Sequence, residues 1–260
     1  MRSINTRLLP LANVVAYVLM VAVNGLAGST TIIGGKLTSE VSDANPTLVT
    51  PAGYTFSIWG VIYILLAVFV IYQAVVRSRP GASRDRIGWL FVMSSAFNIL
   101  WLFAWQYEIL VVSVIIMFLL LATLIAIYLR LGIGVRRVEP AERLAVHLPF
   151  SVYLGWITIA TIANVAATLV SLNWDGFGIA PEIWAIAIII VAFLIAALNA
   201  YSRRDVAYGA VIVWALVGIA VNQSAEPIIV AVALAGAVGV VVALVASILY
   251  RQRPVRRVAA

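Results

Sequence analysis

The sequence predicts an all-α polytopic membrane protein with eight transmembrane helices. Of its 260 residues, 64% are apolar and 10% are charged. A soluble globular chain is roughly 45–50% apolar and about a quarter charged. The apolar residues form runs of about 20, the length at which a helix crosses a hydrocarbon core. The basic residues between these runs alternate in a way that fits a single membrane topology.

The expected helices follow the apolar runs in chain order. They lie at residues 11–28, 56–76, 87–105, 109–129, 146–170, 182–201, 206–222 and 227–249. The first run follows Arg2 and Arg7 and ends in small residues at 27–29, a pattern that a cleaved signal peptide also has. The run is long for a signal peptide, so a retained helix is the preferred interpretation.

Residues that favour helix starts agree with these ranges. Pro140, Pro181 and Pro227 lie at or just before expected helix starts, where a missing N–H is tolerated. Asp205 is placed to cap the seventh helix. The third and fourth helices are so close in sequence that they must form a tight hairpin. The first connection, 29–55, is the longest, and its length predicts either a functional lid or a disordered segment.

The positive charges predict which loops face the cytoplasm. With the N-terminus placed inside, all of the 17 Lys and Arg residues except Lys36 fall on the cytoplasmic side. Cytoplasmic loops are enriched in Lys and Arg, so this alternation favours eight spans with both termini inside. The Arg-rich, Lys-poor usage is typical of a GC-rich bacterial genome, which makes a bacterial inner membrane the expected location.

Composition excludes several classes of protein. With no Cys and one His, the chain has no disulfide and no thiolate or imidazole cluster for a metal. No Asp, Glu, Lys or Arg lies clearly inside an expected span, which argues against channels, pumps and ion-coupled transporters. The net charge of +7 does not predict nucleic-acid binding, because the basic residues lie in short blocks between apolar runs. No catalytic residue or metal site is predicted, and His147 is expected to be interfacial and solvated.

Aromatic and amide residues remain inside the expected spans. The candidate ligand-binding residues among them are Trp59, Tyr63, Asn98, Trp101, Tyr153, Trp156 and Asn164, of which Trp59, Tyr63, Trp101 and Trp156 lie deepest. Within each helix their spacing places them on one face. They can hold helices together through interhelical hydrogen bonds, at about 0.6 kcal/mol for each hydrogen bond of an Asn amide. Alternatively, they can line a pocket for a flat, largely apolar ligand. The interfacial belts are expected to hold Trp105, Trp174, Trp184 and Tyr250.

Three of these patterns form recognisable signatures, at residues 51–63, 97–105 and 153–164. In the second helix a proline and aromatics precede a Trp and, four residues later, a Tyr. The third helix has Asn-x-x-Trp followed by aromatics. The fifth has a Trp with Ala-Thr at +4 and +5 and Asn at +8. In this order the signatures resemble those of the translocator protein/tryptophan-rich sensory protein (TspO/MBR) family.

The resemblance covers about residues 10–172 and implies a five-helix bundle over 1–172, with the loop 29–55 as a lid. Residues 173–260 then form a three-helix transmembrane extension with a basic cytoplasmic tail. The resemblance implies a receptor or sensor that binds a tetrapyrrole such as porphyrin or haem, or a sterol, without an obligatory cofactor. The candidate residues named above would line the pocket. It also implies a homodimer, unless the extra helices cover the same flank and make the chain a monomer.

The chain departs from the family pattern in three places. Ser94 stands where the family often has Gln, and Val152 where it often has Pro. The compact family also lacks the three C-terminal helices. Within them, Trp214 and Asn222 repeat the Trp-x7-Asn spacing of the fifth helix, as a parallel internal repeat would. Two other functions stay open: an uncoupled transporter of a hydrophobic small molecule, and porphyrin photodegradation as a side activity.

Overall fold

The computed structural model describes residues 2–76 and 83–251, and all regular structure in these ranges is helical. The elements are α1 (Arg2–Ser29), α2 (Thr38–Asp43), the 3₁₀ turn η1 (Gly53–Ser57), α3 (Ile58–Val75), α4 (Ser83–Ile87), α5 (Leu90–Gln106), α6 (Leu110–Leu131), α7 (Pro140–Glu142), the π-helical turn η2 (Arg143–His147), α8 (Leu148–Ser171), the 3₁₀ turn η3 (Gly176–Gly178), α9 (Pro181–Arg203), α10 (Val206–Asn222) and α11 (Pro227–Arg251). The all-α prediction is confirmed.

The predicted helix-starting prolines and the predicted Asp205 cap are confirmed. Proline opens α7, α9 and α11. The Asp205 side chain accepts hydrogen bonds from the backbone N–H groups of Ala207 (3.1 Å) and Tyr208 (3.2 Å), so it caps α10. The α5–α6 hairpin turns at Glu108, whose φ of 56° is left-handed. The expected helix 146–170 begins earlier than predicted, because α7 and η2 lead continuously from residue 140 into α8.

Within the described ranges, six helical segments are long and apolar enough to cross a membrane, which supports a polytopic membrane protein. They include α1, α3, α6, α8, α9 and α11. The helices α5 and α10 have 17 residues each, about 26 Å of helix, and are slightly shorter than a hydrocarbon core. The count of eight spans stays a prediction.

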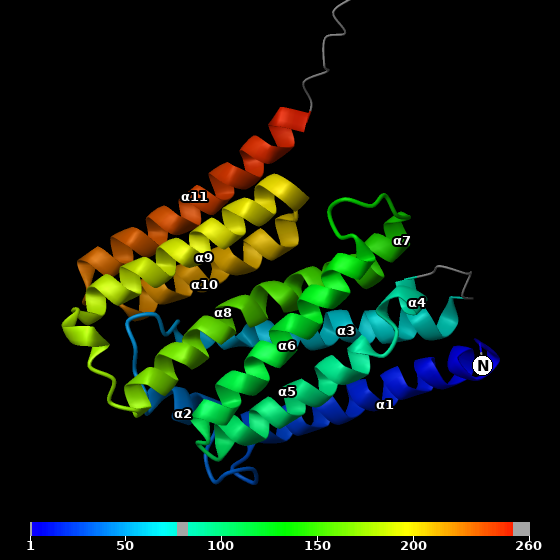
Figure 1. Ribbon diagram of the computed structural model, residues 1–260, viewed down its shortest axis with the longest axis horizontal. Helices are drawn as coiled ribbons and strands as arrows, with labels where there is room; N and C mark the ends of the chain where they lie inside the picture. The colour runs from blue at the N-terminus through cyan, green and yellow to red at the C-terminus, as the bar shows by residue number, and fades with distance from the viewer. Residues whose placement is uncertain (1, 77–82, 252–260) are drawn as a thin grey trace, which may run out of the picture.

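Helix α8 lies at the centre of the molecule (Figure 1). It packs against α3 and α6 on one side and against α10 on the other. Of the residues in the span that contains α8, 56% are buried, compared with 28% for α9 and for α11. The helices α9, α10 and α11 pack on one another as a separate layer over α8 (Figure 1).

The chain runs back and forth between two ends of the bundle (Figure 1). The basic end holds the start of α1, the end of α11, the loop 132–139 and the turn between α9 and α10. The lid end holds residues 30–57, the end of α8 and the start of α9. The arginines of loop 132–139 and of the α9–α10 turn therefore lie at the same end, opposite the lid residue Lys36, and which end faces the cytoplasm stays a prediction.

Polar contacts join α9 and α10 to α6 and α8. Near the basic end, the Tyr128 hydroxyl of α6 donates to Asp205 Oδ2 (2.9 Å) and accepts from Asn199 Nδ2 (3.1 Å). From the first turn of α10, the Tyr208 hydroxyl donates to Thr158 Oγ1 of α8 (3.1 Å). The expectation that His147 is solvated is wrong, since its side chain is 5% exposed. The turn η2 places it beneath the loop 132–139 and the α9–α10 turn instead of at the open interface.

Candidate ligand site

The deep tryptophans predicted from the sequence form one cluster. Trp59 of α3 stacks on Tyr63 with ring centroids 5.8 Å apart and on Trp101 of α5 at 6.3 Å. Its other faces meet Tyr153 and Trp156 of α8, each at 6.2 Å and edge-on. Three helices that are distant in sequence therefore bring these aromatic side chains together, as the sequence interpretation required.

The amides are paired with partners inside the protein. Asn98 Nδ2 donates to the Tyr153 hydroxyl at 3.1 Å, and Asn98 Oδ1 accepts from Asn24 of α1 at 2.6 Å. Asn164 Oδ1 accepts from Trp101 Nε1 at 2.9 Å, and its amide donates to Ser113 at 2.8 Å. These bonds tie α1, α5, α6 and α8 together. The Asn side chains therefore stabilise helix–helix packing through interhelical hydrogen bonds.

A small cavity of about 50 Å³, called the chamber below, lies beside the tryptophan cluster. It is lined by Thr38, Ser42, Thr50, Pro51, Phe56, Trp59, Trp101, Trp105, Trp156, Ile159, Ala160, Ala163, Asn164 and Ala167. Of the predicted pocket residues, Tyr63, Asn98 and Tyr153 lie outside this lining. The volume suits one or two waters and is far below the 300–1,000 Å³ of an ordinary ligand site.

One polar atom at the chamber lacks a partner. The indole Nε1 of Trp156 is buried and donates no hydrogen bond among the described residues. A buried N–H that gains no bond costs roughly 1–3 kcal/mol. Because Trp156 is also a lining residue of the chamber, a molecule bound there is a candidate partner for this donor.

The loop predicted as a lid at 29–55 is residues 30–57 in the structure, between α1 and α3, and this lid closes the chamber from the α5 side. Trp105 Nε1 donates to the Thr38 carbonyl at 3.1 Å, and Gln106 Nε2 donates to Thr38 Oγ1 at 3.3 Å and to the Ala27 carbonyl of α1 at 3.0 Å. The prediction of an interfacial Trp105 is wrong, because the lid covers this end of α5 and leaves the side chain only 6% exposed. The lid also packs directly on Gln106 through Gly34, whose φ of 69° and close approach leave no room for a Cβ.

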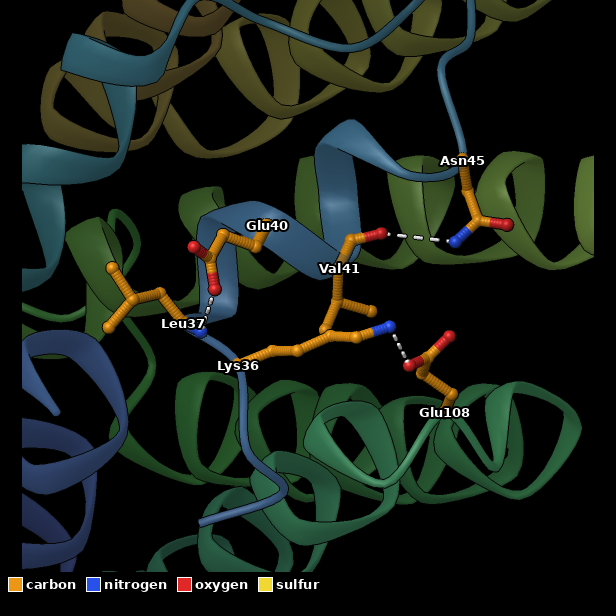
Figure 2. A network of polar contacts seen from close by, with 6 residues as sticks. All are labelled: Lys36, Leu37, Glu40, Val41, Asn45 and Glu108. Atoms are coloured by element: carbon orange, nitrogen blue, oxygen red, sulfur yellow. Dashed lines mark hydrogen bonds and ion pairs between the residues drawn. The ribbon is translucent and has the colours of Figure 1, made fainter. Parts of the chain in front are cut away.

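Figure 2 shows the outer corner of the lid. Lys36 forms an ion pair with Glu108, and both side chains are close to half exposed. The Glu40 carboxylate accepts from the Leu37 N–H at 2.6 Å and so caps α2. Lys36 is the only Lys or Arg expected outside the cytoplasm, and it already has a carboxylate partner.

From the other side, α10 of the C-terminal layer binds the lid. The backbone N–H of Ala52 donates to the Gly218 carbonyl at 3.0 Å. Side chains of α10 and the turn after it donate to lid carbonyls: Trp214 to Thr55 (3.0 Å), Asn222 to Thr50 (3.1 Å) and Gln223 to Thr47 (3.0 Å). The sequence interpretation did not assign these residues to the site. Its only signal was the Trp-x7-Asn spacing of Trp214 and Asn222.

A second cavity of about 800 Å³, called the vestibule, lies between the lid, the C-terminal half of α8 and the start of α9. Its walls include Leu48, Val165, Ala166, Leu169, Trp174, Trp184 and Ile188. The vestibule shares Ser42 and Thr50 with the chamber, so the two cavities meet at the lid. Its charged lining residues are Asp43 and Asp175.

Comparison with known proteins gives one match, to a protein family. The sequence pattern of the TSPO-like protein family matches residues 10–246. No curated protein and no solved structure matches the chain. The match extends beyond the segment 10–172 that carried the resemblance and includes α9, α10 and most of α11. The chain is therefore an integral membrane protein of the TSPO-like protein family.

Proposed function

We propose that this protein binds a flat, largely apolar small molecule under the lid, with a tetrapyrrole as the first candidate. The observation that carries the proposal is the unpartnered Nε1 of Trp156, which lies beside the stacked rings of Trp59 and Trp101. Aromatic faces supply stacking area, and one buried donor supplies orientation. Family membership supports a membrane-embedded sensor or binding protein in general.

The size of the chamber determines how such a ligand would bind. A macrocycle needs several hundred Å³, and the chamber holds about 50 Å³. The vestibule has the required volume and meets the chamber at Ser42 and Thr50. The ligand would enter the vestibule and reach the tryptophans only after the lid moves away from α8.

The charges around the site bear on the chemistry of the ligand. Lys36 is paired with Glu108, and the vestibule contributes Asp43 and Asp175. Ligand carboxylates would therefore have to point away from these aspartates. This arrangement favours a neutral flat molecule such as a sterol as the second candidate. Neither cavity lining includes a His, Cys or Met, so haem would bind without an axial ligand and no more tightly than the metal-free ring.

The test is a titration of the detergent-purified protein with protoporphyrin IX, followed by tryptophan quenching and by the porphyrin absorption band. Trp156→Phe keeps the ring but removes the donor, so we expect binding about 2- to 10-fold weaker. The Trp59→Ala/Asn98→Ala/Trp156→Ala variant should lose saturable binding. Trp89→Phe is the control for optical changes, since Trp89 is 47% exposed at the other end of α5. Equal affinity in all four proteins would overturn the proposal.

An uncoupled transporter is the second candidate function, and the position of the cavities favours it. The vestibule and a pocket at the basic end lie at opposite ends of the seam between α8 and the C-terminal layer. Between them α8 and α10 pack tightly: a Cβ added at Gly155 of α8 would lie only 3.1 Å from the Val211 Cβ of α10. Net protoporphyrin flux into proteoliposomes, slowed by Gly155→Leu, would support transport. Binding without flux would reject it.

A further inference from the structure

The basic end contains a pocket that the proposed binding of a flat ligand under the lid does not use. Its volume is about 630 Å³, and it lies between the loop 132–139, the start of α8 and the turn from α9 to α10. Figure 1 shows this loop next to the end of α9 and far from the lid. The pocket is therefore separate from the chamber and the vestibule.

The charge of this pocket is strongly positive. Five arginines line it: Arg136, Arg137, Arg143, Arg203 and Arg204. None of the five forms an ion pair among the described residues. The one acidic residue in the lining, Asp205, already caps α10 and accepts from Tyr128. The excess positive charge therefore lacks a protein counterion within the described part of the chain.

Backbone contacts fix the shape of the pocket. Gly134 has a φ of 80°, and a Cβ there would lie 2.0 Å from the Arg203 carbonyl oxygen. Arg203 donates back to the Ile133 carbonyl at 3.3 Å, and Arg204 Nε donates to the Ser247 carbonyl at 3.1 Å. The loop is thus fastened to the end of α9, and the pocket does not depend on mobile side chains alone.

Two buried polar side chains line the floor of the pocket. His147 is 5% exposed, and its Nε2 has no hydrogen-bond partner among the described residues. Ser151, one helical turn further along α8, is 2% exposed and lines the same pocket. A buried imidazole nitrogen without a partner is costly unless something fills its site. This observation is independent of the arginines and also points to a bound polar group.

We propose that this pocket binds the phosphate group of an anionic phospholipid. Guanidinium groups bind phosphate through paired N–H donors, and here several of them surround one cavity. Apolar wall residues, among them Leu148, Val206 and Ala210, would contact the glycerol and upper acyl chains. The pocket lies at the ends of membrane-spanning helices, where lipid head groups are found. Those apolar walls favour a lipid over a free phosphate.

The experiment measures phospholipid bound to the full-length protein by native mass spectrometry. Dioleoylphosphatidylglycerol is titrated into the detergent-purified protein, with dioleoylphosphatidylcholine as the neutral-headgroup comparison. Arg137→Gln/Arg143→Gln should weaken phosphatidylglycerol binding about 10- to 30-fold, since each basic residue near the membrane surface contributes roughly fivefold. The matched control Arg84→Gln/Arg130→Gln removes two arginines outside the pocket lining and should keep near wild-type binding.

A second variant tests the cavity without changing charge. Ala210→Phe adds bulk on an exposed wall position and should weaken binding as strongly as the arginine variant. Equal losses in the pocket and control arginine variants, together with normal binding by Ala210→Phe, would overturn the proposal, because surface charge alone would then explain the affinity. Inorganic phosphate that binds at millimolar concentration and displaces the lipid would confirm the phosphate site. If inorganic phosphate binds and phosphatidylglycerol does not, the lipid assignment is rejected.

Discussion

The chamber and the vestibule lie on either side of the same lid, yet they are built in opposite ways. The chamber has the tryptophans, but they fill it, and only about 50 Å³ remains. The vestibule has about 800 Å³, and its walls are mostly apolar. The difference teaches that residues suited to bind an aromatic ligand are equally suited to pack on one another. In this molecule the recognition chemistry and the free volume lie in adjacent places, and the lid separates them.

The lid itself has two unequal attachments. On the α5 side it is held by hydrogen bonds from Trp105 and Gln106 to Thr38 and by an exposed ion pair. On the α10 side it is held by a backbone bond to Gly218 and by three side chains that donate to lid carbonyls. The C-terminal layer therefore does more than cover α8. It anchors the segment that would have to move for the two cavities to join.

The largest expected effect comes from removing a ring of the chamber. Trp101 is 6% exposed, stacks between Trp59 and Trp105, and donates to Asn164. We expect Trp101→Ala to lower the free energy of unfolding by about 3–5 kcal/mol, because a buried aromatic is replaced by a cavity. Denaturant unfolding in detergent measures this. Trp89→Ala, at a 47% exposed site, should change stability by less than about 0.5 kcal/mol.

The outcome also sharpens the contrast between the two cavities. A large loss would mean that the chamber is a packed core whose small volume is structural. A loss below about 1 kcal/mol would mean that the tryptophans are loosely held and that the chamber opens readily.

Much of the fold could be predicted from local features of the sequence. Apolar runs and prolines gave the helix positions, and Asp205 caps α10 as its residue type and place predicted. Helical spacing was also enough to place Trp59 next to Tyr63. The meeting of Trp59 with Trp156 was inferred only through the family resemblance, because no local rule fixes how α3 lies on α8.

Other parts of the site could not be predicted from local patterns. Trp105 looked interfacial because it lies near a helix end, and only the tertiary position of the lid buries it. The contacts of Gln223 and Gly218 with the lid join residues more than 160 positions apart. The vestibule has no sequence signature at all, since a cavity is the result of how three segments fail to fill the space between them.

The second prediction concerns the α10 attachment. A Cβ at Gly218 would lie 2.2 Å from Thr55 Oγ1 and 3.2 Å from Pro51 Cβ. Gly218→Ala must therefore push the lid off α10, at a cost of about 1–3 kcal/mol in stability. The chain has no Cys, so a single Ser42→Cys, which lines both cavities, reports lid opening through its rate of maleimide labelling.

We expect Gly218→Ala to speed this labelling severalfold. Gly236→Ala is the matched control, because its nearest neighbour is Leu216 Cδ1 at an ordinary 3.4 Å. If labelling is unchanged in Gly218→Ala while stability falls, α10 supports the fold without controlling access, and the proposed role of the C-terminal layer is wrong.

The smallest expected effect is at the α5 corner of the lid. The side chains of Lys36 and Glu108 are 44% and 43% exposed, so their ion pair should contribute no more than about 1 kcal/mol. In a double-mutant cycle with Lys36→Met and Glu108→Gln, we expect coupling of a few tenths of a kcal/mol, measured by unfolding and by Ser42→Cys labelling. Raising salt to about 1 M shortens the screening length to about 3 Å and should abolish the coupling. Coupling above about 2 kcal/mol that survives high salt would contradict this prediction. The α5 corner would then hold the lid as firmly as the α10 attachment at Gly218 does.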